Sequence, residues 1–358
     1  MSTVELGLPQ LGGLDGVPTT TDKQTAKDFT SDQEVRWCPG CGDYAVLAAV
    51  RQFLPTLGIR RENTVFVSGI GCSSRFPYYL NTYGMHSIHG RAPAIATGLA
   101  VSRPDLSVWV VTGDGDALSI GGNHLIHALR RNVNLKILLF NNRIYGLTKG
   151  QYSPTSEVGK ITKSTPVGSV DHPFNPISVA LGVEATFVGR AIDSDRAGLT
   201  AVLREAAAHR GTALVEIFQD CPIFNDGSFD VLRRGDEAAE RLIPLTHGEP
   251  IRFGPPDEDG LGRYAVVQEG FGLRVAKTDE VGAEEIVVHD ATDHNLAFAL
   301  SRLSDQDLTH TVTGVFRNVE RLTYDDGARA QVDQARRNGS ADLQLLLNGR
   351  DTWTVAGE

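Results

Sequence analysis

Two short polar motifs in the middle of the chain have the composition of a metal and diphosphate site. The first is Gly113-Asp114-Gly115-Asp116, and the second is the amide pair Asn141-Asn142. Asp114 and Asn142 are 28 residues apart, which is about the length of one strand–helix–strand crossover. Such a crossover brings both side chains to the carboxyl edge of a parallel sheet, where open α/β folds bind ligands. A carboxylate and an amide oxygen suit Mg²⁺, which takes its other ligands from water and phosphate.

Each motif has an ordinary explanation when it stands alone. Gly-Asp-Gly is a common turn, and two asparagines after a strand are usual in loops. The spacing of the motifs, and their positions after two predicted strands, favour a cofactor site over two unrelated turns.

The chain has four cysteines, and their positions form a second pattern. Cys38 and Cys41 belong to a tight Cys-Pro-Gly-Cys knuckle, whereas Cys72 and Cys221 each follow a predicted buried strand. Strand ends of a doubly wound sheet can converge, and four converging thiolates indicate either zinc or an iron–sulfur cluster. The spacing does not separate these two groups. Taken alone, the Cys-x-x-Cys pair is explained by a zinc knuckle, a redox dithiol or chance, and Cys72 and Cys221 by small buried thiols.

The elements that must position these residues alternate between strand and helix. From residue 40 to residue 220, this alternation predicts an α/β fold with a doubly wound, mostly parallel sheet. Residues 1–34 read as a polar arm, 35–235 as the cofactor domain, and 236–358 as a C-terminal extension whose last forty residues are weakly patterned. Strands are expected at 64–70, 106–112, 135–140, 183–188, 212–218, 264–267, 273–276 and 285–288, and helices at 45–54, 92–102, 175–181, 193–209 and 294–303.

Composition narrows the class of protein. The formal net charge is −10, so no basic field would attract nucleic acid or an anionic membrane. No apolar run approaches the roughly 18 residues of a membrane helix, and the first thirty residues have no signal-peptide pattern. We therefore expect a soluble cytoplasmic protein whose cysteines stay reduced.

Taken together, these motifs resemble the β subunit of 2-oxoacid:ferredoxin oxidoreductases. The similarity covers roughly residues 35–235 in unbroken order and rests on the segments 37–41, 69–75, 89–92, 113–116, 141–151 and 221–222. Within that family, the run Pro77-Tyr78-Tyr79-Leu80-Asn81-Thr82-Tyr83-Gly84 is most similar to 2-oxoglutarate-type members.

The resemblance implies a thiamine diphosphate-binding fold and three cofactors. Mg²⁺ would be held by Asp114, Asn142 and the backbone carbonyl of Ile144. A [4Fe–4S] cluster would be ligated by Cys38, Cys41, Cys72 and Cys221. Thiamine diphosphate would contact Gly71, Cys72, Ser73, His89, Gly90, Gly113, Asp114, Gly115, Asp116, Asn142, Ile144, Gly146, Leu147 and Thr148.

Three residues are expected to take part in catalysis. Ser73 and His89 would lie near the thiazolium and the diphosphate. Arg75 would meet the substrate carboxylate, because a guanidinium forms paired hydrogen bonds with a planar carboxylate. The resemblance implies that a 2-oxoacid and coenzyme A become an acyl-CoA and CO₂, with electrons passing through the cluster to ferredoxin.

One further part is expected to lie outside this chain. Thiamine enzymes of this type need a second domain for the aminopyrimidine, and only about 110 residues precede Asp114. The resemblance therefore implies a separate α subunit, with an α₂β₂ assembly and an active site at the subunit interface. Pyruvate or a branched-chain 2-oxoacid is an alternative substrate. Other classes are a non-oxidative thiamine decarboxylase or synthase with structural or zinc-bound cysteines, and a non-catalytic electron-transfer subunit.

Overall fold

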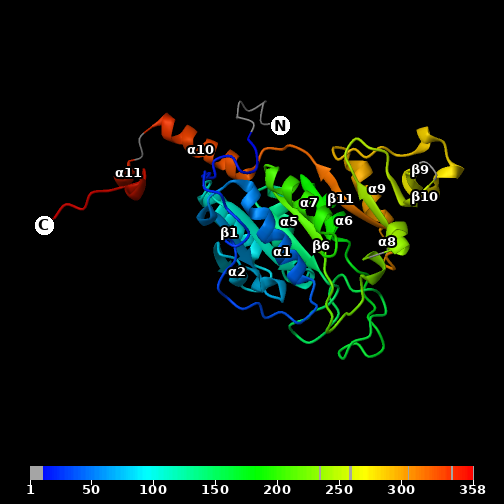
Figure 1. The fold of residues 1–358 in the computed structure, drawn as a ribbon. Helices are drawn as coiled ribbons and strands as arrows, with labels where there is room; N and C mark the ends of the chain where they lie inside the picture. The colour runs from blue at the N-terminus through cyan, green and yellow to red at the C-terminus, as the bar shows by residue number, and fades with distance from the viewer. Residues whose placement is uncertain (1–10, 234, 258–259, 305, 340–341, 358) are drawn as a thin grey trace.

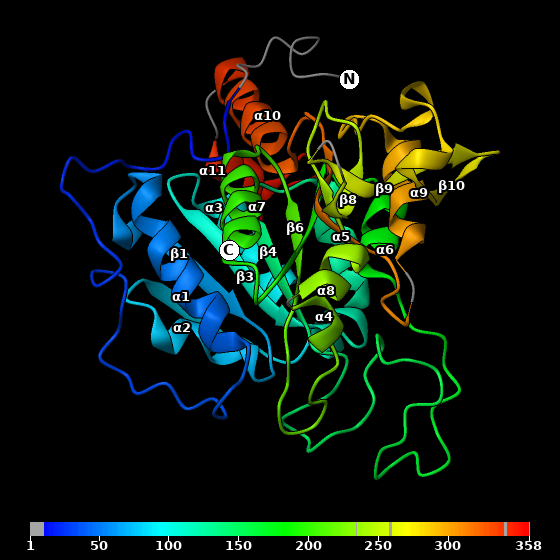
Figure 2. The same cartoon turned by 45° about the vertical axis from the view of Figure 1, so that its right-hand side comes forward.

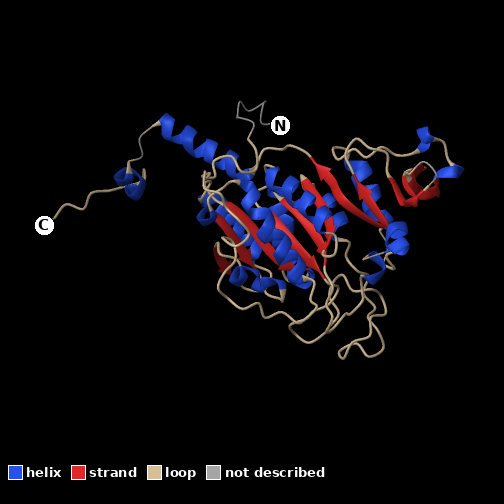
Figure 3. Cartoon of the chain, in the orientation of Figure 1, coloured by secondary structure: helices blue, strands red, loops and turns tan. Residues whose placement is uncertain are grey.

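The computed structural model describes residues 11–233, 235–257, 260–304, 306–339 and 342–357. One large sheet contains the strands β1 (Thr64–Ser68), β2 (Tyr83–His86), β3 (Ser107–Gly113), β4 (Lys136–Asn141), β5 (Phe187–Ile192), β6 (Ala213–Phe218), β7 (Leu242–Leu245) and β11 (Thr311–Asn318). Their order is β2-β1-β3-β4-β6-β5-β11-β7, and all neighbours are parallel except β5 and β11. Helices cover both faces (Figure 3). The predicted doubly wound, mostly parallel α/β fold is confirmed.

Alternate residues of the central strands enter two separate cores. In β3, Val108 and Val110 pack on one face, while Trp109 and Val111 pack on the other. This period of two is the pattern of a strand that is buried on both sides. One face carries α3 (Ala92–Ser102), α5 (Gly122–Arg131), α6 (Pro176–Gly182) and α9 (His294–Leu303), and the other carries α1 (Asp43–Phe53) and α7 (Arg196–Ala208) (Figures 1 and 2).

Two predicted strands differ from the structure. The strand expected at 183–188 begins only at Phe187, because Glu184 takes a left-handed backbone (φ 61°) in the turn before it. The prediction of a strand at 285–288 was wrong. Residues 283–285 form a 3₁₀ turn, and Ile286 and Val288 each make only an isolated bridge. The helices expected at 92–102 and 294–303 coincide with α3 and α9.

The chain beyond residue 235 adds to the main sheet and also builds a smaller one. It contributes β7 and β11 to the large sheet, and it forms an antiparallel sheet of β8 (Arg252–Pro256), β9 (Gly262–Glu269) and β10 (Gly272–Lys277). Three further helices are α8 (Gly235–Arg241), α10 (Tyr324–Asn338) and α11 (Leu343–Asn348). The domain boundary at residue 235 stays a prediction. None of the described helices is long and apolar enough to cross a membrane.

The N-terminal arm and α10 meet at the amino edge of the sheet, around Arg210. The Arg210 guanidinium donates to both carboxylate oxygens of Asp326, at 2.9 and 2.6 Å, and to the backbone oxygens of Gly12 and Asp15. This paired arrangement is the strongest geometry for an arginine–carboxylate contact. The charge and hydrogen bonds of Arg210 contribute to holding the pKa of Asp326 at about 2, against the effect of burial. Both terminal segments are therefore fastened at one residue.

A buried histidine beside this point makes the stability dependent on pH. His209 contacts Thr186 Oγ1 (2.8 Å) and Asn318 Oδ1 (3.0 Å), and burial, followed by the charge of Lys136, lowers its pKa to about 3. The depressed value means that the folded state excludes a proton that the unfolded chain takes up below about pH 6.5. The stability from neutral His209 is complete above that pH and falls as the pH drops toward 3.

We expect acidification from pH 6.5 to 4.5 to remove about 2 kcal/mol of stability through His209. Urea unfolding of the full chain at several pH values measures this slope. The slope gives the number of protons taken up on unfolding. In the variant His209→Gln, this number should be smaller by about one. An equal slope in both proteins would show that His209 already titrates normally in the folded state.

Candidate active site

Three strand ends at the carboxyl edge of the sheet enclose a cavity of about 220 Å³. The segments are 70–73 after β1, 113–116 at the end of β3, and 142–148 after β4. His89 completes the lining from the turn before α3. Of the residues expected to contact thiamine diphosphate, all line this cavity except Gly90, which lies beside His89. The structure thus brings the predicted set together in one place.

Asp114 is one of two buried carboxylates that line this cavity. It begins the short helix α4 (Asp114–Leu118), and its Oδ2 accepts hydrogen bonds from Ser153 Oγ (2.5 Å) and Thr155 Oγ1 (2.6 Å). Burial raises the pKa of Asp114 to about 6, although both hydroxyls oppose the shift. A divalent cation would favour the ionised form and offset the cost of burying it. The site therefore fits Mg²⁺.

The backbone after β4 directs neighbouring side chains to opposite sides. Arg143 adopts a left-handed conformation (φ 56°), which is uncommon outside glycine and asparagine. Asn142 and Ile144 line the cofactor cavity, and Asn142 Oδ1 accepts a hydrogen bond from the Ile144 N–H at 3.2 Å. Asn141 instead donates to Glu216 Oε1 at 2.7 Å. Of the amide pair, only Asn142 is placed to meet a cation beside Asp114.

The Asp116 carboxylate fixes the positions of His89 and of two loops by hydrogen bonds. Its Oδ1 accepts from His89 Nδ1 (2.5 Å), from the Gly90 N–H (2.7 Å) and from the Ile70 N–H (3.1 Å). Its Oδ2 accepts from Thr112 Oγ1 at 2.7 Å. The Asp116 side chain is 1 % exposed, so these bonds are shielded from water. With Nδ1 engaged, the other ring nitrogen of His89 is free to act in the cavity.

We expect Asp116→Asn to lower kcat/KM about tenfold to hundredfold, because His89 loses its charged acceptor. The pH dependence of kcat/KM should shift as well, which a purely structural defect would not cause. Thr112→Val is the matched control, since it removes one bond to the same carboxylate and leaves the His89 contact in place. A normal rate and pH profile in Asp116→Asn would contradict this positioning role.

The loop that follows Asn142 closes over the strand end of β3. Tyr145 donates through its hydroxyl to the Gly115 carbonyl at 3.1 Å, and a Cβ on Gly115 would lie 2.1 Å from the Tyr145 ring. Gly115 is therefore required by close packing. Gly146 is likewise near Cys72, since a Cβ there would be 3.2 Å from the Cys72 sulfur. Leu147, 51 % exposed, lies at the mouth of the cavity.

The four cysteines gather beside this cavity and carry free thiols. Cys72 lines the cavity itself, and Cys41 Sγ accepts from Gln219 Nε2 at 3.2 Å. Gly40 of the knuckle packs near Pro222, the neighbour of Cys221. Burial, followed by the charge of Asp43, raises the pKa of Cys72 to about 11, and burial also raises the pKa of Cys41 and of Cys221. Bound thiophilic metal would reverse these shifts by stabilising the thiolates.

A bound metal would need more of these thiols to converge on one centre than the described residues show. A tetrahedral zinc ion needs sulfurs about 2.3 Å from one centre. Over the residues that the structure describes, no three His, Cys, Asp or Glu side chains converge in a way that could hold a metal ion. Four gathered thiols are suitable donors for zinc or for an iron–sulfur cluster, and the binding of either group stays a prediction.

The remaining expected residues divide into one inside the cavity and one outside it. Ser73 is buried and lines the cavity. Arg75 is not among the lining residues, and its Nη1 donates to the Arg36 carbonyl at 3.1 Å. Its role toward a substrate carboxylate stays a prediction. Sequence reasoning overlooked Ser153 and Thr155, whose only signal was a hydroxyl-rich stretch in an apparently featureless loop.

Comparison with known proteins places this geometry in a family. The model of the thiamine pyrophosphate enzyme C-terminal binding domain matches residues 69–217. The chain is 72% identical to the 2-oxoglutarate oxidoreductase subunit KorB of Mycobacterium tuberculosis, over 99% of this chain and 95% of that protein. It is 45% identical to the β subunit of 2-oxoacid:ferredoxin oxidoreductase 1 of Aeropyrum pernix, over 67% of this chain and 75% of that one.

A solved structure gives the same result. The 2-oxoglutarate:ferredoxin oxidoreductase from Magnetococcus marinus, solved with 2-oxoglutarate, coenzyme A and succinyl-CoA bound, matches with a TM-score of 0.72 and 33% identity. The match covers 92% of this chain and 97% of that chain. Together with the cavity at the carboxyl edge, these similarities show that the chain belongs to the β subunits of 2-oxoacid:ferredoxin oxidoreductases, and within them to the 2-oxoglutarate type.

Proposed function

We propose that this β subunit, together with a separate α subunit, oxidatively decarboxylates 2-oxoglutarate with coenzyme A. The products would be succinyl-CoA, CO₂ and one proton, while two electrons leave one at a time to ferredoxin. The observation that carries the proposal is the 72% identity to a 2-oxoglutarate oxidoreductase β subunit over 99% of this chain. The cavity around Asp114 supports it, since it gathers a buried carboxylate, an amide and a histidine.

The residues of this chain would bind and orient the reacting groups. Asp114, Asn142 and the Ile144 carbonyl would hold Mg²⁺ against the diphosphate, and Gly146 to Thr148 would offer donors to its oxygens. Asp116 fixes the ring of His89 beside this place. When bound, thiamine diphosphate supplies the electron sink that cleaves the bond between the carboxylate and the 2-oxo carbon. The four cysteines would hold a [4Fe–4S] cluster next to the same cavity.

An apolar surface around the cavity supports the need for an α subunit. Ile70 and Leu147 line the mouth and are 46% and 51% exposed. Ile88 and Ile120, on adjacent segments, are 74% and 61% exposed. Side chains of this kind gathered on one surface mark a protein interface. The partner would exclude water from the cavity and supply the groups that this chain lacks, in an α₂β₂ assembly.

The test is anaerobic purification of this chain with its partner subunit. Iron, sulfide and thiamine diphosphate are quantified, and viologen reduction is followed with 2-oxoglutarate, pyruvate and a branched-chain 2-oxoacid. We expect coenzyme A-dependent reduction that is fastest with 2-oxoglutarate. Zinc in place of iron would contradict electron transfer through an iron–sulfur cluster. Faster turnover of pyruvate would contradict the assignment of 2-oxoglutarate as the substrate. Reduced cysteine ligands are consistent with a cytoplasmic enzyme.

A further inference from the structure

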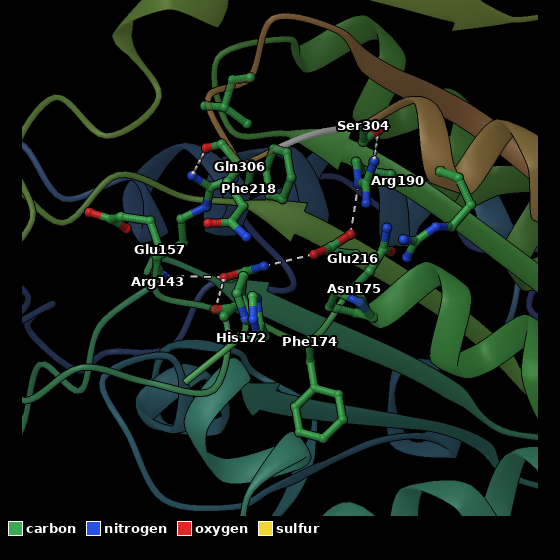
Figure 4. Close-up of a pocket in the computed structure, with 16 residues that line it drawn as sticks. Arg143, Glu157, His172, Phe174, Asn175, Arg190, Glu216, Phe218, Ser304 and Gln306 are labelled. Carbon is green, nitrogen blue, oxygen red and sulfur yellow. Dashed lines mark hydrogen bonds and ion pairs between the residues drawn. The ribbon is translucent and has the colours of Figure 1, made fainter. Parts of the chain in front are cut away.

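A second cavity, of about 550 Å³, opens at the same edge of the sheet beyond β4 (Figure 4). It lies against β6 and β5, with walls from the 172–176 segment and from residues that follow α9. It shares no lining residue with the cofactor cavity. Its volume is within the range of sites for small organic ligands and is far larger than a single water requires.

The floor of this second cavity is a buried ion pair. Arg190 Nε donates to Glu216 Oε2 at 2.7 Å, and the two side chains are 3% and 0% exposed. Arg190 Nη1 donates to Ser304 Oγ (2.8 Å) and to the Val312 carbonyl (3.2 Å). These bonds fix the guanidinium, and the ring of Phe218 lies 4.9 Å from it. Desolvating such a pair is expensive, so its presence is not explained by stability alone.

The fixed guanidinium still has donors to offer. Arginine carries five N–H donors, and the hydrogen bonds of Arg190 to the described residues use only Nε and Nη1. The two hydrogens on Nη2 are left for a bound acceptor. Both oxygens of Glu216 are engaged inside the protein, since Asn141 Nδ2 donates to the second one at 2.7 Å.

The charge of the lining favours an anion. Among the described residues that line the cavity, Arg143, Arg190 and Arg302 outnumber the two carboxylates, Glu157 and Glu216. Glu216 is paired with Arg190, and Glu157 is paired with Lys160 at 2.9 Å. Arg302 lies on the exposed wall and forms no hydrogen bond or ion pair with any residue that the structure describes. A guanidinium in this setting is suited to paired hydrogen bonds with a carboxylate or a phosphate.

A chain of hydrogen bonds joins this cavity to the cofactor cavity. Thr155 lines the second cavity, and its hydroxyl lies 2.6 Å from Asp114 Oδ2 and 2.8 Å from Asn141 Oδ1. Because one hydroxyl hydrogen cannot serve both acceptors fully, a change at Asn141 alters the bond to Asp114. The order along the chain is Asp114, Thr155, Asn141, Glu216 and Arg190.

We propose that the second cavity binds a small organic anion through Arg190 and Arg302, and that its occupancy changes the affinity of the Asp114 site for Mg²⁺ and thiamine diphosphate. The shared chemistry of the ligand is an oxyanion that accepts paired N–H bonds. The coupling rests on the proposed coenzyme site, whereas the binding of the anion does not.

The test uses the complex of the full chain with its partner, first saturated with Mg²⁺ and thiamine diphosphate to block the diphosphate site. Malonate and inorganic phosphate are titrated separately by calorimetry at constant ionic strength, which distinguishes carboxylate from phosphate ligands. Arg302→Gln should weaken binding about tenfold through one lost charged contact. Arg204→Gln, an equal charge change on the exposed side of α7, should leave binding unchanged.

A second measurement addresses the coupling. The affinity of the complex for thiamine diphosphate is determined with and without the anion that binds, in the wild type and in Arg302→Gln. We expect a shift in the wild type that Arg302→Gln reduces. No binding of either anion, or equal binding in Arg302→Gln and the wild type, would overturn the site. Anion binding without any shift in coenzyme affinity would overturn the coupling.

Discussion

Replacing Asp114 by alanine is expected to abolish Mg²⁺-dependent binding of thiamine diphosphate, with at least about a hundredfold loss of affinity. The variant removes the buried carboxylate that would face the cation. It also removes the acceptor that the hydroxyls of Ser153 and Thr155 share, so local disorder is a competing cause. Asp114→Asn keeps the shape of the side chain and one of its oxygens. If the negative charge makes the main contribution to binding, this variant should lose nearly as much coenzyme affinity as Asp114→Ala.

Equilibrium titration of the coenzyme at several Mg²⁺ concentrations measures this effect, and circular dichroism confirms that each variant is folded. The exposed Asp105, which is paired with Arg103 before β3, provides the matched control as Asp105→Ala. That variant should bind normally. Coenzyme affinity that is unchanged in both Asp114 variants would remove this residue from the metal site.

The second large effect is expected at Cys72. Cys72→Ala should eliminate the broad visible absorption of an iron–sulfur cluster and lower the iron content well below about four per chain, because a cubane needs all four thiolates. Viologen reduction should be lost with the colour. Cys72 is the one of the four cysteines that lines the cofactor cavity, so its loss would also remove the ligand by which a cluster would meet that cavity.

The control for Cys72→Ala lies two residues away. Ser74 is buried, and its hydroxyl has no hydrogen-bond partner within the described part of the chain, so Ser74→Ala changes a neighbouring side chain without removing a ligand. Ser74→Ala should retain its colour and iron. Iron and absorption that survive in Cys72→Ala would show that the cluster is held differently. A zinc content of one per chain in the wild type would exclude the cluster altogether.

Residues at the ends of strands were the most predictable part of the site. Asp114 and Asn142 follow apolar runs, and the carboxyl ends of parallel strands must share an edge. Their convergence could therefore be predicted from the hydrophobic pattern alone. The parallel sheet followed from the same pattern, because each of its central strands is a short apolar run between helices.

Residues that act through tertiary contacts were not predictable in this way. Ser153 and Thr155 reach Asp114 from a loop without periodicity, almost forty residues further along the chain. Asp116 was expected to contact thiamine diphosphate, but its bond to His89, which lies 27 residues earlier in the turn before α3, could not be read from the sequence. The strand expected at 183–188 stopped short of Arg190, whose charge in β5 is paired with Glu216, a residue that is adjacent only in the folded sheet.

The contacts around Arg210 have a practical consequence for handling the protein. The segments by which the chain enters and leaves the fold, at residues 12–15 and at Asp326, are both fastened to this guanidinium at the amino edge of the sheet. The cofactor cavity opens at the opposite, carboxyl edge. A surface linker attached at the amino edge beside Arg210 would therefore leave the opposite edge, with the cavity and the surface proposed to meet the α subunit, free for its partner.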